Sequence, residues 1–159
     1  LMSGGIIILI TAAGGAFGAT LRAAGLGQAI QRLAESQVSG GGAPALLSGL
    51  PLLGLAFAVA SLIKFAQGSS TTAMIVTSGM IVAMIDPTQL TFNAAYLVAA
   101  IGGGSLVGSW MNDSGFWIYA KMGGLTEVQT LKSWTPTLAI VGTVSFVLTV
   151  ILAGLFPLN

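Results

Sequence analysis

The chain has 159 residues, of which 55% are hydrophobic and only 6% are charged. A soluble domain has about 25% charged residues, so a soluble fold of this length could not cover its surface with so few charges. Cysteine and histidine are absent, which excludes disulfides, Cys-ligated metals and Ser-His-Asp chemistry, and the net charge of +1 argues against nucleic-acid binding. We therefore expect one all-α integral membrane domain over residues 1–159, embedded in a lipid bilayer, with no metal and no cofactor.

The first apolar run extends from Ile6 to Leu21 and contains Gly14 and Gly18. Such a GxxxG pair lets a neighbouring helix approach closely, although glycine is common in membrane helices in general. The amphipathic residues 24–35 could lie along the membrane interface or form the second arm of a re-entrant hairpin. Residues 39–44 have the composition of a flexible linker.

The second apolar run, Leu46 to Ile63, has 18 residues and is long enough to span a bilayer before Lys64 ends it. Gly68 can then break the helix, and a set of N-cap residues follows it: Ser69, Ser70, Thr71 and Thr72. The third run, Ala73 to Ile85, has only 13 residues, which is short for a full span and typical of a half-helix or re-entrant segment.

The start of a half-helix presents free N–H groups and the positive end of the helix dipole. With Lys64 close by in sequence, residues 68–72 could therefore bind a carboxylate. The same spacing also fits an ordinary polar turn that faces water, with Lys64 as a positive-inside anchor.

Residues 86–89 form a turn, and the fourth run extends from Phe92 to Met111 with a second GxxxG pair at Gly104 and Gly108. The polar residues Asn112, Asp113, Ser114 and Gly115 should end this helix. Asp113 could carry a proton or bind a substrate hydroxyl, or it could cap the turn or mark the membrane surface. Asn112 and Ser114 stand beside it, which favours the functional interpretation.

Residues 119–132 indicate an interfacial loop, in which Thr126 and Gln129 resemble a capping box. The last run, Pro136 to Leu155, is an uncharged span, and Trp134 just before it is expected to be an interface anchor.

The few charges give an orientation. Arg22 and Arg32 lie in the first polar connection, and Lys121 and Lys132 lie in the last. Both connections face the cytoplasm, as the positive-inside rule requires, if the short third run enters and leaves the membrane on one side. This placement favours the re-entrant interpretation.

Two motifs resemble the C-terminal half of the gluconate permease family of proton symporters: Gly68-Ser-Ser-Thr-Thr-Ala and Asn112-Asp-Ser-Gly-Phe-Trp. Residues 14–18 and 130–135 are similar to this family as well, and the resemblance covers nearly the whole chain. One departure is Trp110, which stands where well-known members carry histidine.

The resemblance implies a multi-pass carrier in a prokaryotic inner membrane that imports gluconate, or a related hydroxy-acid or amino-acid anion, together with protons. It also implies a two-repeat fold with broken helices, of which this chain is one repeat and the C-terminal half. The N-terminal half would supply the other side of the site, and the carrier could be a homo-oligomer.

The sequence thus predicts that the two polar breaks meet in the protein interior and hold a small anion. The expected substrate-binding residues are Gly68, Ser69, Ser70, Thr71, Thr72, Asn112, Asp113 and Ser114, with Asp113 in proton coupling and Lys64 as an anion contact. Three alternatives stay open. The chain could belong to a permease for another substrate, such as D-serine or another organic acid. It could be a structural subunit whose glycine faces assemble helices, or an intramembrane enzyme, which would need a histidine or a second carboxylate.

Overall fold

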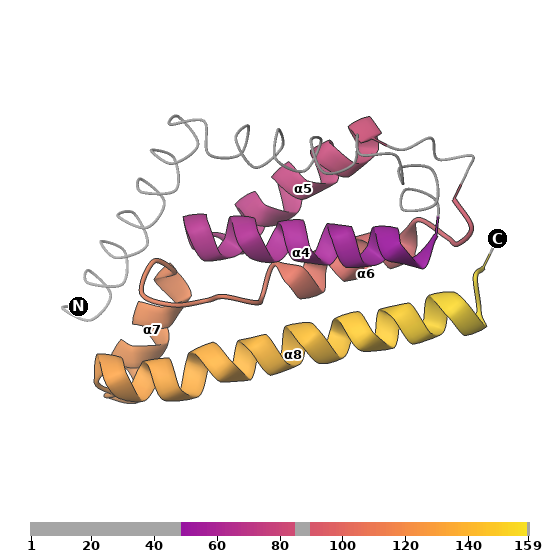
Figure 1. The fold of residues 1–159 in the computed structure, drawn as a ribbon. Coiled ribbons are helices and arrows are strands. Elements are labelled where there is room, and N and C mark those ends of the chain that lie inside the picture. Colours follow the sequence, from indigo (N-terminus) through magenta and orange to yellow (C-terminus); the bar gives the residue numbers. More distant parts are fainter. Residues whose placement is uncertain (1–48, 85–89, 159) are drawn as a thin grey trace.

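The computed structural model describes residues 49–84 and 90–158, and the regular secondary structure in these ranges is helical (Figure 1). The predictions for residues 6–21, 24–35, 39–44 and 86–89 lie outside the described residues. The described helices are α4 (Leu50–Gln67), α5 (Ser70–Met84), α6 (Ala95–Gly104), α7 (Ser114–Gly123) and α8 (Glu127–Leu155). Of these, α4 and α8 are long and apolar enough to cross a membrane.

Helix α4 passes through Lys64 and ends at Gly68. Gly68 adopts a left-handed conformation (φ 72°) and its N–H donates to the Lys64 carbonyl, which caps the helix. The predicted break at Gly68 is therefore confirmed. The alternative in which Lys64 is a positive-inside anchor beside a water-facing turn is wrong, because Lys64 lies in the last turn of α4 with only 1% of its surface exposed.

Helix α5 begins directly after this break, and the predicted N-cap is confirmed. The Ser69 hydroxyl accepts a hydrogen bond from the Thr72 N–H at 3.2 Å, which satisfies one of the free donors of the first turn. Because α5 has only 15 residues, it is shorter than α4 and α8, as the third apolar run predicted. Its re-entrant path stays a prediction.

Helix α6 is shorter than predicted. It ends at Gly104, and the chain is not helical from there to the start of α7, so the single run from Phe92 to Met111 is wrong. Three consecutive glycines at 102–104 weaken the helix, and Gly108 has φ 84°, which a helix does not allow. Gly104 and Gly108 therefore do not form one helical GxxxG face.

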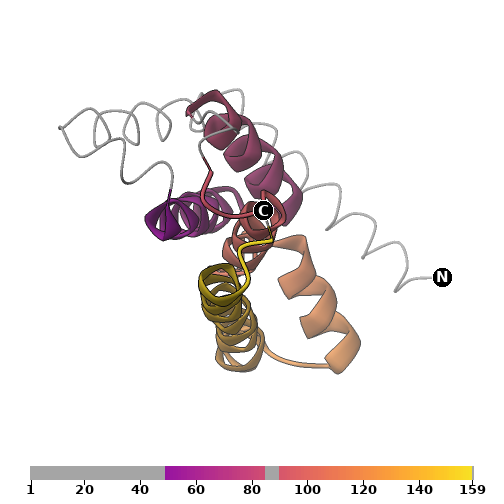
Figure 2. The ribbon, with the colours of Figure 1, turned by 90° about the vertical axis from the view of Figure 1, so that its right-hand side faces the viewer.

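Helix α6 lies between α4 and α8, which Figure 2 shows nearly end-on. The glycines allow this close packing. A Cβ on Gly104 would collide with the Phe57 backbone carbonyl of α4, and a Cβ on Gly103 would lie 2.9 Å from the Gly142 carbonyl of α8. Single glycines thus set the distance between α6 and its two neighbours.

The predicted interfacial loop over residues 119–132 is wrong, because α7 and α8 occupy most of it. Gly124 ends α7 in a left-handed conformation (φ 62°), and the predicted capping box of Thr126 and Gln129 is present at the start of α8. The sequence of this segment resembles a loop because its charged residues lie on the exposed faces of the two helices.

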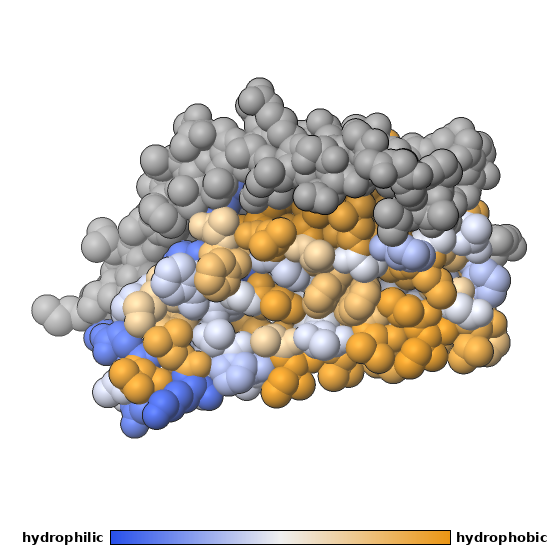
Figure 3. Space-filling view, viewed as in Figure 1, coloured by the Kyte–Doolittle hydropathy of each residue, from blue (hydrophilic) through white to orange (hydrophobic). Residues whose placement is uncertain are grey.

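Figure 3 shows apolar side chains along the visible length of the helices and hydrophilic residues gathered where α7 meets the start of α8. Helix α8 exposes a series of large apolar side chains: Ile140, Val141, Val144, Val147, Leu148, Ile151 and Leu152. An exposed face of this kind is typical of a helix in contact with lipid.

Candidate functional site

The two polar breaks meet, as the sequence predicted. They line one cavity of about 380 Å³, whose wall consists of Gln67, Gly68, Ser69, Ser70, Thr71, Asn112, Asp113, Ser114, Gly115 and Ile118. Gly68 is essential to this approach, because a Cβ there would collide with the Asn112 backbone carbonyl. The Ser70 hydroxyl also bridges to the unwound segment after α6, since it donates to the Ser105 carbonyl at 2.9 Å.

All predicted binding residues except Thr72 line this cavity. Thr72 is buried instead, and its hydroxyl donates to the Ser69 hydroxyl at 3.0 Å. Lys64 is not in the wall either. Its ammonium group lies behind the cavity and reaches it through Asp113 and Gly68.

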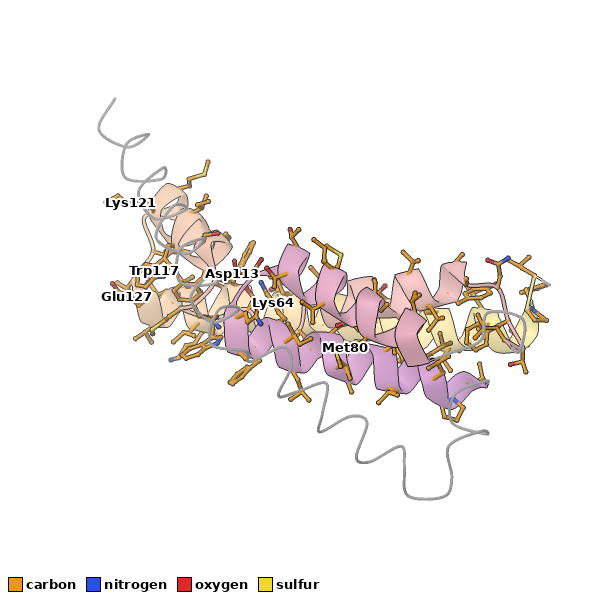
Figure 4. The ribbon with its side chains drawn as sticks, turned by 90° about the horizontal axis from the view of Figure 1, so that it is seen from above. Lys64, Met80, Asp113, Trp117, Lys121 and Glu127 are labelled. Atoms are coloured by element: carbon orange, nitrogen blue, oxygen red, sulfur yellow. The ribbon has the colours of Figure 1, made fainter. Side chains whose placement is uncertain are left out.

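Lys64 and Asp113 form an ion pair between the last turn of α4 and the start of α7. The Lys64 Nζ lies 2.7 Å from Asp113 Oδ2 and 2.8 Å from the Gly68 carbonyl, and Figure 4 shows the two side chains next to each other. Lys64 is 1% exposed and Asp113 is 14% exposed. Two charges with so little access to water need each other, because either one alone would be strongly unfavourable at this position.

The Asp113 carboxylate accepts two further hydrogen bonds. Its Oδ1 accepts from the Gly115 N–H at 2.9 Å and thereby caps α7, so the capping role that was the alternative for Asp113 is present. Its Oδ2 also accepts from the Ser109 hydroxyl, which in turn accepts from the Trp134 indole N–H at 2.9 Å. Donors from α4, the unwound segment and α7 thus fix the carboxylate at the edge of the cavity.

The carbonyl of Phe65 ties the unwound segment to the end of α4. It accepts hydrogen bonds from the Trp110 indole N–H at 3.0 Å and from the Asn112 amide Nδ2 at 2.7 Å. The Trp110 ring also stacks on the Phe65 ring, with centroids 5.6 Å apart. Asn112 is therefore oriented with its Nδ2 toward Phe65, and its buried Oδ1 has no partner among the described residues.

Comparison with known proteins gives the family of the chain. Residues 1–155 match the model of the GntP family permease. The chain belongs to this family.

Several curated GntP-family relatives have names that state a substrate. The low-affinity gluconate transporter of Escherichia coli K12 is 36% identical over 147 residues, which cover 91% of this chain and 30% of that protein. The gluconate permease of Pseudomonas aeruginosa is 36% identical over 148 residues, with 92% and 30% covered. The Gnt-II system L-idonate transporter of Escherichia coli K12 is 37% identical over 130 residues, with 82% and 27% covered. The chain thus spans 30% or less of these relatives, which are named as transporters or permeases, and no solved structure matches it.

In this GntP-family chain, the sequence analysis did not assign four residues to the site: Gln67, Ser109, Ile118 and Trp134. Gln67 is a polar residue at the end of an apolar run, which could have marked it. The interface position expected for Trp134 stays a prediction, and in the structure its indole N–H donates to Ser109 and its ring stacks on Tyr119 at 5.0 Å. Ser109 could not be found from the sequence, since its role depends on contacts that only the unwound segment makes possible.

Proposed function

We propose that this chain forms one repeat of a secondary active transporter that imports gluconate, or a related small hydroxy-acid anion, with protons across a bacterial inner membrane. The observation that carries the proposal is the cavity at which two interrupted helical segments meet beside a buried ion pair. Interrupted helices at a shared site are characteristic of secondary transporters. Membership in the GntP permease family and the gluconate and L-idonate names of relatives support the substrate class.

The substrate carboxylate binds at the start of α5. The first turn of a helix has N–H groups without intrahelical partners and carries the positive end of the helix dipole. Ser69, Ser70 and Thr71 line the cavity at this point. Ser69 and Thr71 add hydroxyl donors, whereas the Ser70 hydroxyl already donates to the Ser105 carbonyl. Asn112 Oδ1, a buried acceptor without a partner among the described residues, receives a hydrogen bond from a substrate hydroxyl.

Charge balance connects the anion to the proton. Lys64 and Asp113 together are neutral, so an added carboxylate would leave a net negative charge beside an ion pair with little exposed surface. Uncompensated charge in such surroundings is strongly unfavourable. A proton on Asp113 restores neutrality, removes one of the two acceptors of the Lys64 ammonium and makes Lys64 available to the anion. The proposal therefore couples one proton to each monovalent anion.

The remaining expectations complete the proposal. The N-terminal half of the same permease forms the second repeat and the opposite wall of the site, and the assembled carrier could be a homo-oligomer. The transporter acts as a carrier and not as an enzyme.

Uptake by the full-length protein tests this function. We expect Asp113→Asn to abolish proton-driven accumulation of gluconate while exchange of internal for external gluconate continues, because the neutral amide mimics the protonated carboxylate. Ser70→Ala should raise the KM for uptake. Accumulation driven by a pH gradient in Asp113→Asn at the wild-type level would contradict the coupling role. Wild-type uptake of D-serine or another organic acid in place of gluconate would reassign the substrate.

A further inference from the structure

Gln67, the last residue of α4, has a side chain that nothing in the described fold satisfies. Its side chain is buried, with 1% of the residue exposed, yet neither its amide N–H₂ group nor its amide oxygen has a hydrogen-bond partner among residues 49–84 and 90–158. Buried amides almost always have partners, and an unpaired one is unfavourable. Gln67 also lines the cavity between the two breaks. The missing partner is therefore expected on the cavity side.

We infer that Gln67 is a specificity residue that binds a hydroxyl group of the transported anion. This inference rests on the proposed function. An amide offers one acceptor and two donors, and a hydroxyl can both donate and accept, so the two groups match. An ammonium group has donors only, so it can satisfy the amide oxygen of Gln67 but not its N–H₂ group. Gln67 thus favours a hydroxy acid over an amino acid of the same size.

The position of Gln67 indicates which hydroxyl it binds. Only Gly68 separates Gln67 from Ser69, whose hydroxyl caps the helix start that is proposed to hold the carboxylate. A hydroxyl close to the carboxylate carbon is therefore within reach of Gln67. Asn112 Oδ1, on the other break, is a second unpaired acceptor in the same cavity. Two separate polar groups then bind hydroxyls from two sides.

The variant that tests this inference is Gln67→Met, which keeps the length of the side chain and removes the amide. Because the amide has no partner among the described residues, its loss should leave the Tm of the purified full-length protein unchanged or raise it. Affinity for gluconate should fall about tenfold, the order of one hydrogen bond. Both are measured in detergent, by thermal unfolding and by equilibrium binding.

The matched control is Thr77→Val in α5. The Thr77 hydroxyl is also buried without a partner among the described residues, but Thr77 does not line the cavity. We expect the same neutral or positive effect on Tm and no effect on gluconate affinity. This control separates removal of a buried polar group from removal of a substrate contact.

A series of monodeoxy analogues of gluconate locates the contact. One analogue should bind the wild type more weakly than gluconate does. The same analogue should bind Gln67→Met as tightly as it binds the wild type, because it lacks the hydroxyl that Gln67 would bind. Discrimination against the matching amino acid should also decrease in the variant. Equal gluconate affinity in the wild type and Gln67→Met, or a lower Tm in the variant, would overturn the role of Gln67 but leave the proposed function standing. A wild type that binds neither gluconate nor any related anion would instead overturn the proposed function.

Discussion

The buried face of α4 is apolar as far as Ile63 and polar in the last turn. Leu52, Leu53, Ala56, Ala60 and Ile63 have no exposed surface, and in the last turn Lys64 and Gln67 are 1% exposed. Burial of the apolar side chains stabilises the helix packing directly. Burial of Lys64 and Gln67 does the opposite unless partners compensate it, and only Lys64 has partners among the described residues. One helix thus combines an apolar structural segment with a polar segment that, in the proposed function, serves the ligand.

The largest expected effect comes from breaking the Lys64–Asp113 ion pair at the polar end of α4. Lys64→Met removes the cation and leaves Asp113 buried without its counter-ion, which should destabilise the protein by about 3 kcal/mol. Thermal unfolding of the full-length protein measures this loss. Adding Asp113→Asn in the same protein should recover much of the stability, because no uncompensated charge remains, but it should not recover uptake. If Lys64→Met alone unfolds like the wild type, the ion pair is not coupled as described.

The next effect comes from disturbing the packing of α6 on the apolar part of α4. Gly104→Ala places a Cβ against the Phe57 backbone carbonyl and should cost about 1–3 kcal/mol, the range for overpacking. The matched control is Gly102→Ala in the same helix, where an added Cβ meets nothing within 4 Å. This control should stabilise the protein by about 0.5–1 kcal/mol, because alanine favours the helix over glycine. Equal effects at the two positions would contradict the close packing of α6 on α4.

A smaller effect concerns the contact between the end of α4 and the unwound segment after α6. Trp110→Phe keeps a ring to stack on Phe65 but removes the indole N–H that donates to the Phe65 carbonyl. Loss of this one hydrogen bond should cost about 1 kcal/mol in thermal unfolding. Asn112 continues to donate to the same carbonyl at 2.7 Å, so the cavity and uptake should be retained. Complete loss of uptake in this variant would show that Trp110 has a role beyond holding the segment.

The smallest effect is expected for a substitution outside α4. Lys121 is exposed on α7, and Lys121→Gln should change the stability by less than about 0.5 kcal/mol. Thermal unfolding and gluconate uptake should both match the wild type. A loss as large as that of Lys64→Met would mean that burial does not distinguish the two lysines.

The sequence predicted the two breaks because local chemistry determines them. Gly68 ends one helix through its left-handed conformation, Ser69 caps the next, and Asp113 caps α7. By contrast, hydropathy alone could not predict the end of α6, because the unwound segment contains Leu106, Val107 and other apolar residues that resemble a continuing span.

The partners at the site depend on contacts that are distant in sequence. Lys64 and Asp113 are 49 residues apart, and Ser109 and Trp134 are 25 residues apart. No local pattern specifies which lysine meets which carboxylate. For the same reason, the missing partners of Gln67 become apparent only when its surroundings are known.

The central claim is that residues from both breaks enclose the same anion, and substrate protection of single cysteines tests it most directly. The chain has no cysteine of its own, so Thr71→Cys, Ser114→Cys and the exposed α8 control Val128→Cys can each be labelled alone in a cysteine-free background of the full-length protein. The account predicts that gluconate slows labelling at positions 71 and 114 with the same concentration dependence and leaves position 128 unchanged. Protection at neither position, or protection at position 128 as well, would contradict it.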